Sequence, residues 1–132
     1  MVGDLLQMNE VLSLSPLSHT WILDLDGTLV VHNGYKTGED AFLPGALEFL
    51  LSIPVNDWII ILTAREEEVR QRTENFLREN GVRYNAIFFG VPMGERVLIN
   101  DKKPSGLICA YALSPERNRG YVGDLFEIDS TL

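Results

Sequence analysis

The apolar residues of this chain fall into short unbroken runs separated by polar turns. The first run, residues 20–23, ends at Asp24-Leu25-Asp26-Gly27, and the second, residues 58–62, is rich in isoleucine. Three more runs follow, at residues 86–89, 96–99 and 106–112. Apolar runs without polar alternation are typical of parallel strands covered on both faces. The pattern therefore predicts five buried strands.

Two helices are predicted between these strands. Pro44-Gly45 opens a short helix over residues 46–51, because proline is tolerated in a first turn. Thr63-Ala64-Arg65-Glu66 has the form of a capping box, which predicts a helix from Thr63 to about Asn80 with Gly81 as its stop. Its charged side chains are expected to pair on the solvent face, as Glu66/Arg70, Glu68/Arg72 and Glu74/Arg78. Strands that alternate with helices favour an α/β sandwich with a parallel sheet.

Composition and charge narrow the class of protein. The length predicts one compact domain over residues 1–132, with residues 1–18 and 120–132 as peripheral segments. The 45% hydrophobic and 23% charged fractions are ordinary for a soluble globular protein. The 19 acidic and 11 basic residues give a net charge of −8, which repels phosphate backbones and anionic lipid. Nucleic acid and membranes are therefore disfavoured as partners, whereas a metal cation is favoured.

Cysteine content and targeting signals predict a cytoplasmic protein. Cys109 is the single cysteine, so it forms no internal disulfide, and its apolar run predicts burial. The first 19 residues contain no Lys or Arg, so the basic leader of a secretory signal is not expected. The longest strongly apolar stretch, residues 58–62, is far below the roughly 20 residues that cross a bilayer.

Polar residues that could carry chemistry follow three of the predicted strands. Asp24 and Asp26 follow the first strand, Thr63 ends the second, and Asp101 with Lys102-Lys103 follows the fourth. In an open parallel sheet, ligands bind at the carboxyl ends of the strands. We therefore expect acids, a hydroxyl group at a helix start and a lysine to meet at one edge.

This set of groups suits phosphate chemistry. Asp24, Asp26 and Asp101 supply the hard oxygen ligands that Mg²⁺ prefers. Thr63, the helix N-terminus and a lysine would bind a phosphate brought to that ion. A carboxylate held against phosphorus can attack it to form an aspartyl-phosphate, and a second carboxyl group can move protons.

The chain resembles the haloacid dehalogenase (HAD) superfamily of phosphotransferases. Its first motif, Asp-x-Asp-Gly-Thr after an apolar strand, is matched by Asp24-Leu25-Asp26-Gly27-Thr28. The second, a Ser or Thr that ends the next strand, is matched by Thr63, and the fourth, an acid that ends a later strand, by Asp101. The resemblance covers residues 20–112. It implies a Rossmann-like three-layer sandwich with a five-stranded parallel sheet.

The resemblance also implies roles for these residues. Asp24 would be the nucleophile and a metal ligand, Asp26 the general acid/base whose backbone carbonyl also binds the metal, and Asp101 a further metal ligand. The family's third motif, a Lys or Arg before the last acid, is matched only by Arg96, which is expected inside a strand. We therefore assign the phosphate-binding cation to Lys103, which Pro104 would stiffen, with Lys102 as the alternative.

Other residues are expected to contact the substrate or to lie on the surface. The predicted substrate-binding residues are Leu25, Gly27, Ala64, Arg65 and Lys102. Tyr35, Lys36 and Arg65 are candidates for contacts beyond the phosphate, although an exposed first-turn Arg65 is an equal alternative. His19 and His32 have no partner at ligand spacing and are expected at the surface.

The spacing between motifs leaves no room for a cap domain. Related enzymes that carry a cap insert it between the first motif and the next helix, or between the second and third motifs. Here only residues 29–43 and 82–95 are found there. Residues 29–42 should form a small flap with Asn33-Gly34 as a hairpin turn. The site is then open, and a large substrate or a neighbouring subunit in a homo-oligomer would cover it.

The predicted activity is Mg²⁺-dependent hydrolysis of a phosphomonoester, with a small phosphorylated metabolite such as a sugar phosphate as substrate. A nucleotide or polynucleotide phosphatase of the same fold is an alternative. A receiver-like domain is a second alternative, although it would carry adjacent acids after strand one and its phosphorylated Asp after strand three. A third is a non-catalytic module that binds phosphate or Mg²⁺.

Overall fold

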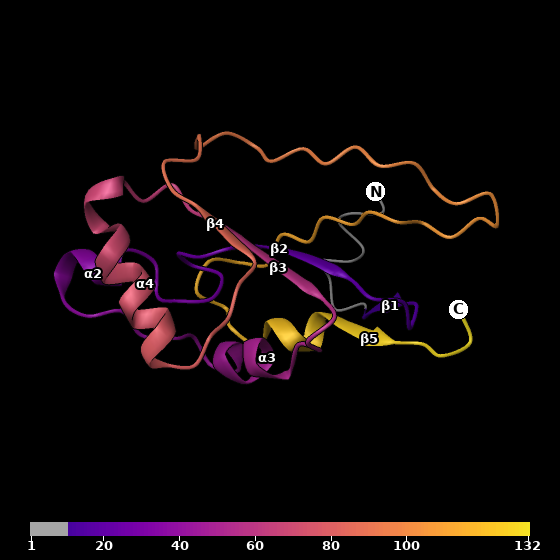
Figure 1. Ribbon diagram of the computed structural model, residues 1–132, viewed down its shortest axis with the longest axis horizontal. Coiled ribbons are helices and arrows are strands. Elements are labelled where there is room, and N and C mark those ends of the chain that lie inside the picture. The colour runs from indigo at the N-terminus through magenta and orange to yellow at the C-terminus, as the bar shows by residue number, and fades with distance from the viewer. Residues whose placement is uncertain (1–10) are drawn as a thin grey trace.

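Two small parallel sheets organise residues 11–132, the part of the chain that the computed structural model describes. The larger sheet has the strand order β2-β3-β4, formed by Thr20–Asp24, Trp58–Leu62 and Ala86–Phe88. The smaller sheet pairs β1, Leu12–Leu14, with β5, Phe126–Ile128 (Figure 1). The expectation of an open α/β protein with parallel strands is confirmed at this level.

The expectation of one five-stranded sheet is wrong, because two of its strands do not form. Residues 96–99 and 106–112 lie in an extended arm, residues 91–115, which runs away from the sheets and returns (Figure 1). Apolar side chains on the arm are exposed, including Val97 at 80% and Ile99 at 91%. β2 is consequently an edge strand of its sheet.

The chain ends and the cysteine also differ from expectation. β1 and β5 lie in the segments predicted to be peripheral, and Val122 from the second of these belongs to the hydrophobic core. Cys109 lies on the arm and is exposed rather than buried, because its apolar run forms no strand. The predicted lack of a basic leader concerns mainly residues 1–10, which are outside the described part.

The helices are α2 (Gly34–Thr37), α3 (Ala46–Ser52) and α4 (Arg70–Glu79), with short 3₁₀ turns η1 (Glu67–Val69) and η2 (Val122–Leu125). α3 follows Pro44-Gly45, as predicted, and Gly81 follows the end of α4 with φ +76°. The prediction that a capping box at Thr63 starts the helix is wrong. The Thr63 hydroxyl accepts a hydrogen bond from the Arg65 N–H at 3.1 Å, and helical structure begins only at η1.

The charge pairs on α4 also differ from the predicted ones. Arg70 pairs with Glu67 and Glu74 rather than with Glu66. Arg72 donates to the backbone carbonyls of Tyr35 and Gly38, so it ties α4 to α2. Within residues 11–132, no helix is long and apolar enough to cross a membrane.

The hydrophobic core lies on one face of the larger sheet. Ile59 and Ile61 of β3 are fully buried there, against residues of α3, α4 and the loop after β2. On strands β2, β3 and β4, the side chains of Ile22, Trp58 and Phe88 are 45%, 58% and 53% exposed. The prediction of strands buried on both faces is therefore wrong, since the arm does not cover this part of the sheet.

We expect Ile61→Ala to lower the free energy of unfolding by about 2–5 kcal/mol, because it removes buried methyl groups and leaves a cavity. Urea unfolding measures this change. The control Val55→Ala truncates a side chain that is 82% exposed and should change stability by less than about 0.5 kcal/mol. Equal effects of the two variants would contradict this assignment of the core.

Candidate functional site

Asp24 is the last residue of β2 and presents a partly open carboxylate at the carboxyl end of the sheet. Its side chain is 39% exposed. The Thr28 hydroxyl donates to Asp24 Oδ2 at 3.0 Å, and Arg96 Nη1 donates to Oδ1 at 2.8 Å. Gly27, with φ +82°, makes the turn that brings Thr28 back to Asp24. Asp24 is therefore oriented by two donors and remains accessible.

Asp26 follows two residues later in a very different environment. Arg65 Nε donates to Asp26 Oδ2 at 3.0 Å, and Nη2 donates to Oδ1 at 2.9 Å. The Asp26 side chain is only 16% exposed. The two acids at i and i+2 therefore have different environments: Asp24 is partly open, and Asp26 is held by a bidentate ion pair.

Arg65 is a buried structural cation, which contradicts its prediction as a substrate-binding residue. Its guanidinium also donates to both oxygens of Asp40 and to the Thr73 hydroxyl, at 2.7 to 2.9 Å. It lies 4.0 Å from the centre of the Tyr35 ring. All five N–H donors of a guanidinium are therefore engaged within the protein. Burial opposes the charge, but the bonds and the attraction of Asp40 and Asp26 outweigh it and raise the pKa of Arg65.

Thr63 lies one residue beyond Leu62, which is in register with Asp24, so it reaches the same edge of the sheet. It is 1% exposed, and its hydroxyl accepts the Arg65 N–H. Ala64 is exposed beside it. Leu25, another predicted substrate contact, is 1% exposed and belongs to the core. Thr63 and Ala64 therefore lie at the predicted edge, whereas the Leu25 side chain is unavailable to a ligand.

The fourth-motif residues do not join this edge. Asp101, Lys102 and Lys103 are exposed on the arm, where the Gly106 N–H donates to the Lys103 carbonyl in a turn. Arg96, not Lys103, is the cation that contacts Asp24. The placement of Lys103 as the phosphate-binding lysine is wrong in this arrangement, because the strand expected to deliver it does not form.

The three predicted metal ligands do not form a cation site as they are placed. Residues 11–132 contain no group of three or more His, Cys, Asp or Glu side chains arranged to hold a metal ion. Asp24 accepts from Thr28 and Arg96, while both oxygens of Asp26 accept from Arg65. The donors on these carboxylates are N–H and O–H groups, so this arrangement does not fit Mg²⁺.

Sequence reasoning missed a turn that packs on Gly27. The Asn118 N–H donates to the Gly27 carbonyl at 2.8 Å, and Asn118 Oδ1 accepts from the His32 N–H at 2.8 Å. A Cβ atom at Gly27 would lie 3.0 Å from Cγ of Arg117 and 3.6 Å from His32 Nδ1. His32 is not a surface residue, since Nδ1 is buried without a hydrogen-bond partner among the described residues. No signal in the sequence indicates this contact, because His32 and Asn118 lie 86 positions apart.

The flap over the site contains a helix instead of the predicted hairpin turn. Asn33 adopts a left-handed conformation, φ +55°, and precedes α2. An antiparallel bridge joins Val30 to Phe42 at the base of the flap. Tyr35 stacks on Arg65 from this flap, and Lys36 lies 5.9 Å from the centre of the same ring. Tyr35 therefore supports Arg65 in the site.

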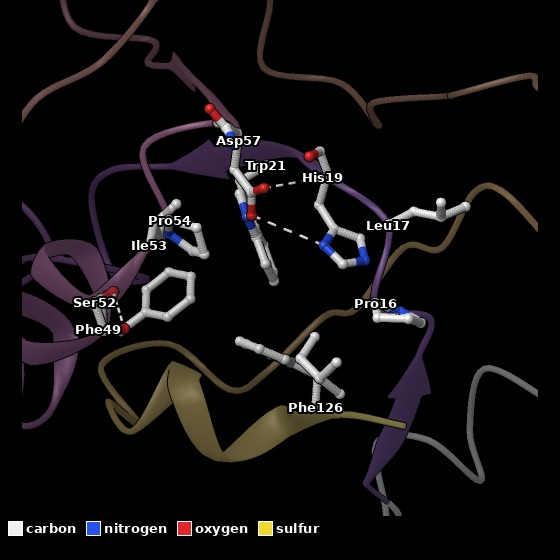
Figure 2. Close-up of a pocket in the computed structure, with 13 residues that line it drawn as sticks. Pro16, Leu17, His19, Trp21, Phe49, Ser52, Ile53, Pro54, Asp57 and Phe126 are labelled. Atoms are coloured by element: carbon white, nitrogen blue, oxygen red, sulfur yellow. Dashed lines mark hydrogen bonds and ion pairs between the residues drawn. The ribbon is translucent and has the colours of Figure 1, made fainter. Parts of the chain in front are cut away.

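A separate cavity of about 500 Å³ lies at the opposite, amino end of β2 (Figure 2). Trp21, Phe49 and Phe126 form its aromatic wall. Asp57 accepts from Trp21 Nε1 at 3.0 Å and from the His19 N–H at 3.1 Å. The His19 side chain is 21% exposed, so it is partly buried rather than at the surface. None of the predicted site residues lines this cavity.

Comparisons with models of protein families, with curated proteins and with solved structures each found no match to this chain. The resemblance to the HAD superfamily therefore depends on the motifs alone.

We expect Arg65→Met to destabilise the protein by about 3–5 kcal/mol, because it leaves the carboxylates of Asp26 and Asp40 without their buried counter-ion. The matched control is Arg70→Met, which removes an exposed guanidinium from Glu67 and Glu74 and should have a much smaller effect. Urea unfolding at neutral pH compares the two variants. Similar losses of stability would contradict the structural role of Arg65.

Proposed function

We propose that this protein is a capless, HAD-like phosphomonoester hydrolase that uses Asp24 as its nucleophile. The observation that carries the proposal is the position of the Asp24 carboxylate. It is partly open at the carboxyl end of β2 and is oriented by Thr28 and Arg96. Thr63 at the end of the neighbouring strand supports the same reading, as do the motif residues from Asp24 to Thr28.

The chemistry divides into two displacements at phosphorus. In the first, an Asp24 oxygen bonds to phosphorus while the bond to the leaving oxygen breaks, and that oxygen takes the electron pair and a proton from water. In the second, water attacks the aspartyl-phosphate, the bond to Asp24 breaks, and inorganic phosphate leaves. In this proposal Asp26, whose two oxygens accept hydrogen bonds from Arg65, accepts the proton of that water and returns it to solvent.

Arg96 reduces the repulsion between the two anions that must meet. A carboxylate and a phosphate ester both carry negative charge, and the Arg96 guanidinium lies 2.8 Å from Asp24 Oδ1. Its side chain is 34% exposed, so the guanidinium can contact a phosphate that approaches from solvent. Such fixed positive charge stabilises the charge of a phosphoryl group during transfer.

A small phosphorylated metabolite, such as a sugar phosphate, is the proposed substrate class. The net charge of −8 disfavours polynucleotides, and residues 29–42 form only a short flap. A neighbouring subunit that closes the open site is part of this proposal, as is a cytoplasmic location. A phosphatase screen with sugar phosphates, nucleotides and phosphorylated lipid precursors tests the substrate class.

We expect Asp24→Asn to abolish turnover of para-nitrophenyl phosphate, because an amide is not a nucleophile at phosphorus. The matched control is Asp124→Asn, an exposed acid in η2, which should keep wild-type turnover. Circular dichroism and the melting temperature verify that both variants fold. Wild-type turnover by Asp24→Asn would rule out this residue as the nucleophile.

Mg²⁺ stays in the proposal through the motif resemblance alone, because the carboxylates as placed do not fit it, and no step is assigned to it. We expect chelation with EDTA to remove turnover and added Mg²⁺ to restore it, since hard cations complement phosphate and carboxylate oxygens. The melting temperature with and without EDTA separates lost activity from lost fold. Turnover that is insensitive to chelation would contradict the Mg²⁺ requirement and leave Asp24 as the nucleophile.

A non-catalytic phosphate-binding module is the second candidate function. It is favoured by the engagement of Asp24 with Arg96 and of Asp26 with Arg65, which leaves both acids paired. Binding of inorganic phosphate by a wild-type protein that turns over no ester in the screen would support this candidate over the hydrolase.

A further inference from the structure

The turn at residues 117–121 is fixed to the loop that follows β2. Asn118 bonds to the Gly27 carbonyl through its N–H and to the His32 N–H through its side chain, although His32 and Asn118 are 86 positions apart. The Tyr121 N–H donates to the Pro44 carbonyl at 2.6 Å on the far side of the turn. These bonds hold the turn against the loop that begins directly after Asp24 and carries Asp26 and Gly27.

The backbone of this turn is held in an unfavourable conformation. Asn118 and Tyr121 have φ of +63° and +54°, and they are two of the three non-glycine residues with positive φ in residues 11–132. Such conformations persist only where the surrounding contacts determine them, and they cluster at functional sites. Asparagine adopts the left-handed region readily, so the strained residue of the two is Tyr121.

Arg117 is the residue that this turn presents to the loop. Its Cγ would be 3.0 Å from a Cβ at Gly27, so its aliphatic stem lies on the glycine between Asp26 and Thr28. Arg117 is exposed, and its guanidinium makes no ion pair or hydrogen bond with any residue of the described range 11–132. Arg65 and Arg96, by contrast, are engaged by Asp26 and Asp24.

We propose that Arg117 contacts the substrate by binding an oxygen of its phosphoryl group at the Gly27 loop, with Asn118 as its positioning residue. The inference depends on the proposed function for the identity of the ligand. A guanidinium suits this task because its planar N–H groups match two phosphate oxygens. Glycine at position 27 leaves the space that the stem of Arg117 needs, because any side chain there would press on it.

The test compares Arg117→Gln and Arg117→Lys with Arg119→Gln, a change of an exposed arginine two positions away. We expect Arg117→Gln to raise both the KM for para-nitrophenyl phosphate and the inhibition constant of inorganic phosphate by roughly ten- to hundred-fold. Arg117→Lys should raise these constants less, because lysine keeps the positive charge although it lacks the planar N–H groups of a guanidinium. Arg119→Gln should match wild type, and melting temperatures verify that every variant folds.

Calorimetric titration with inorganic phosphate makes the test independent of turnover. If wild type hydrolyses no ester but binds phosphate more tightly than Arg117→Gln does, the hydrolase proposal fails while the role of Arg117 stands. Wild-type affinity for phosphate in Arg117→Gln would overturn that role, and so would a wild-type protein that binds no phosphate. An equal loss in Arg119→Gln would also overturn it, because general surface charge would then explain the effect.

Discussion

The buried guanidinium of Arg65 is the interaction on which the arrangement of this site depends. It joins Asp26 in the loop after β2, Asp40 in the flap and Thr73 in α4. Three segments that are distant in the sequence therefore share one cation, and each carboxylate needs it because an unpaired buried charge is strongly destabilising. The Tyr35 ring stacks on one face of the guanidinium. The flap and the acidic loop are consequently one structural unit.

This ion pair also gives the two acids of the first motif different properties. Asp26 is fixed by two bonds from Arg65, whereas Asp24 keeps a side chain that is 39% exposed and receives one bond from Thr28 and one from Arg96. A nucleophile must be reached by its substrate, and a proton acceptor must stay in place while water approaches. In the proposed function these two tasks would fall to Asp24 and Asp26, which lie within the five residues from Asp24 to Thr28.

The sequence pattern correctly predicted those helices and strands that nearby residues determine. β2 and β3 match their apolar runs, and α3 begins after Pro44-Gly45 as expected. The wrong predictions concern which distant parts of the chain come into contact. An arginine in an apparent capping box looks exposed, and the burial of Arg65 is explained only by its distant partners Asp26, Asp40 and Thr73. The run at residues 96–99 has strand-like composition, but composition does not determine which edge a strand joins, so the arm could not be foreseen.

The effect of the net charge of −8 on ligands depends on where the arginines lie. Three arginines approach the Asp24–Thr28 segment: Arg65 from the segment after β3, Arg96 from the arm and Arg117 from the turn before η2. Fields from distant surface charges are screened over about 8 Å at physiological ionic strength, so a ligand at this loop is governed by the nearest guanidinium groups. An acidic surface can therefore exclude long polyanions while one short loop binds a single phosphate. Under the proposed function, selectivity for small substrates would follow from where the few cations lie, not from their number.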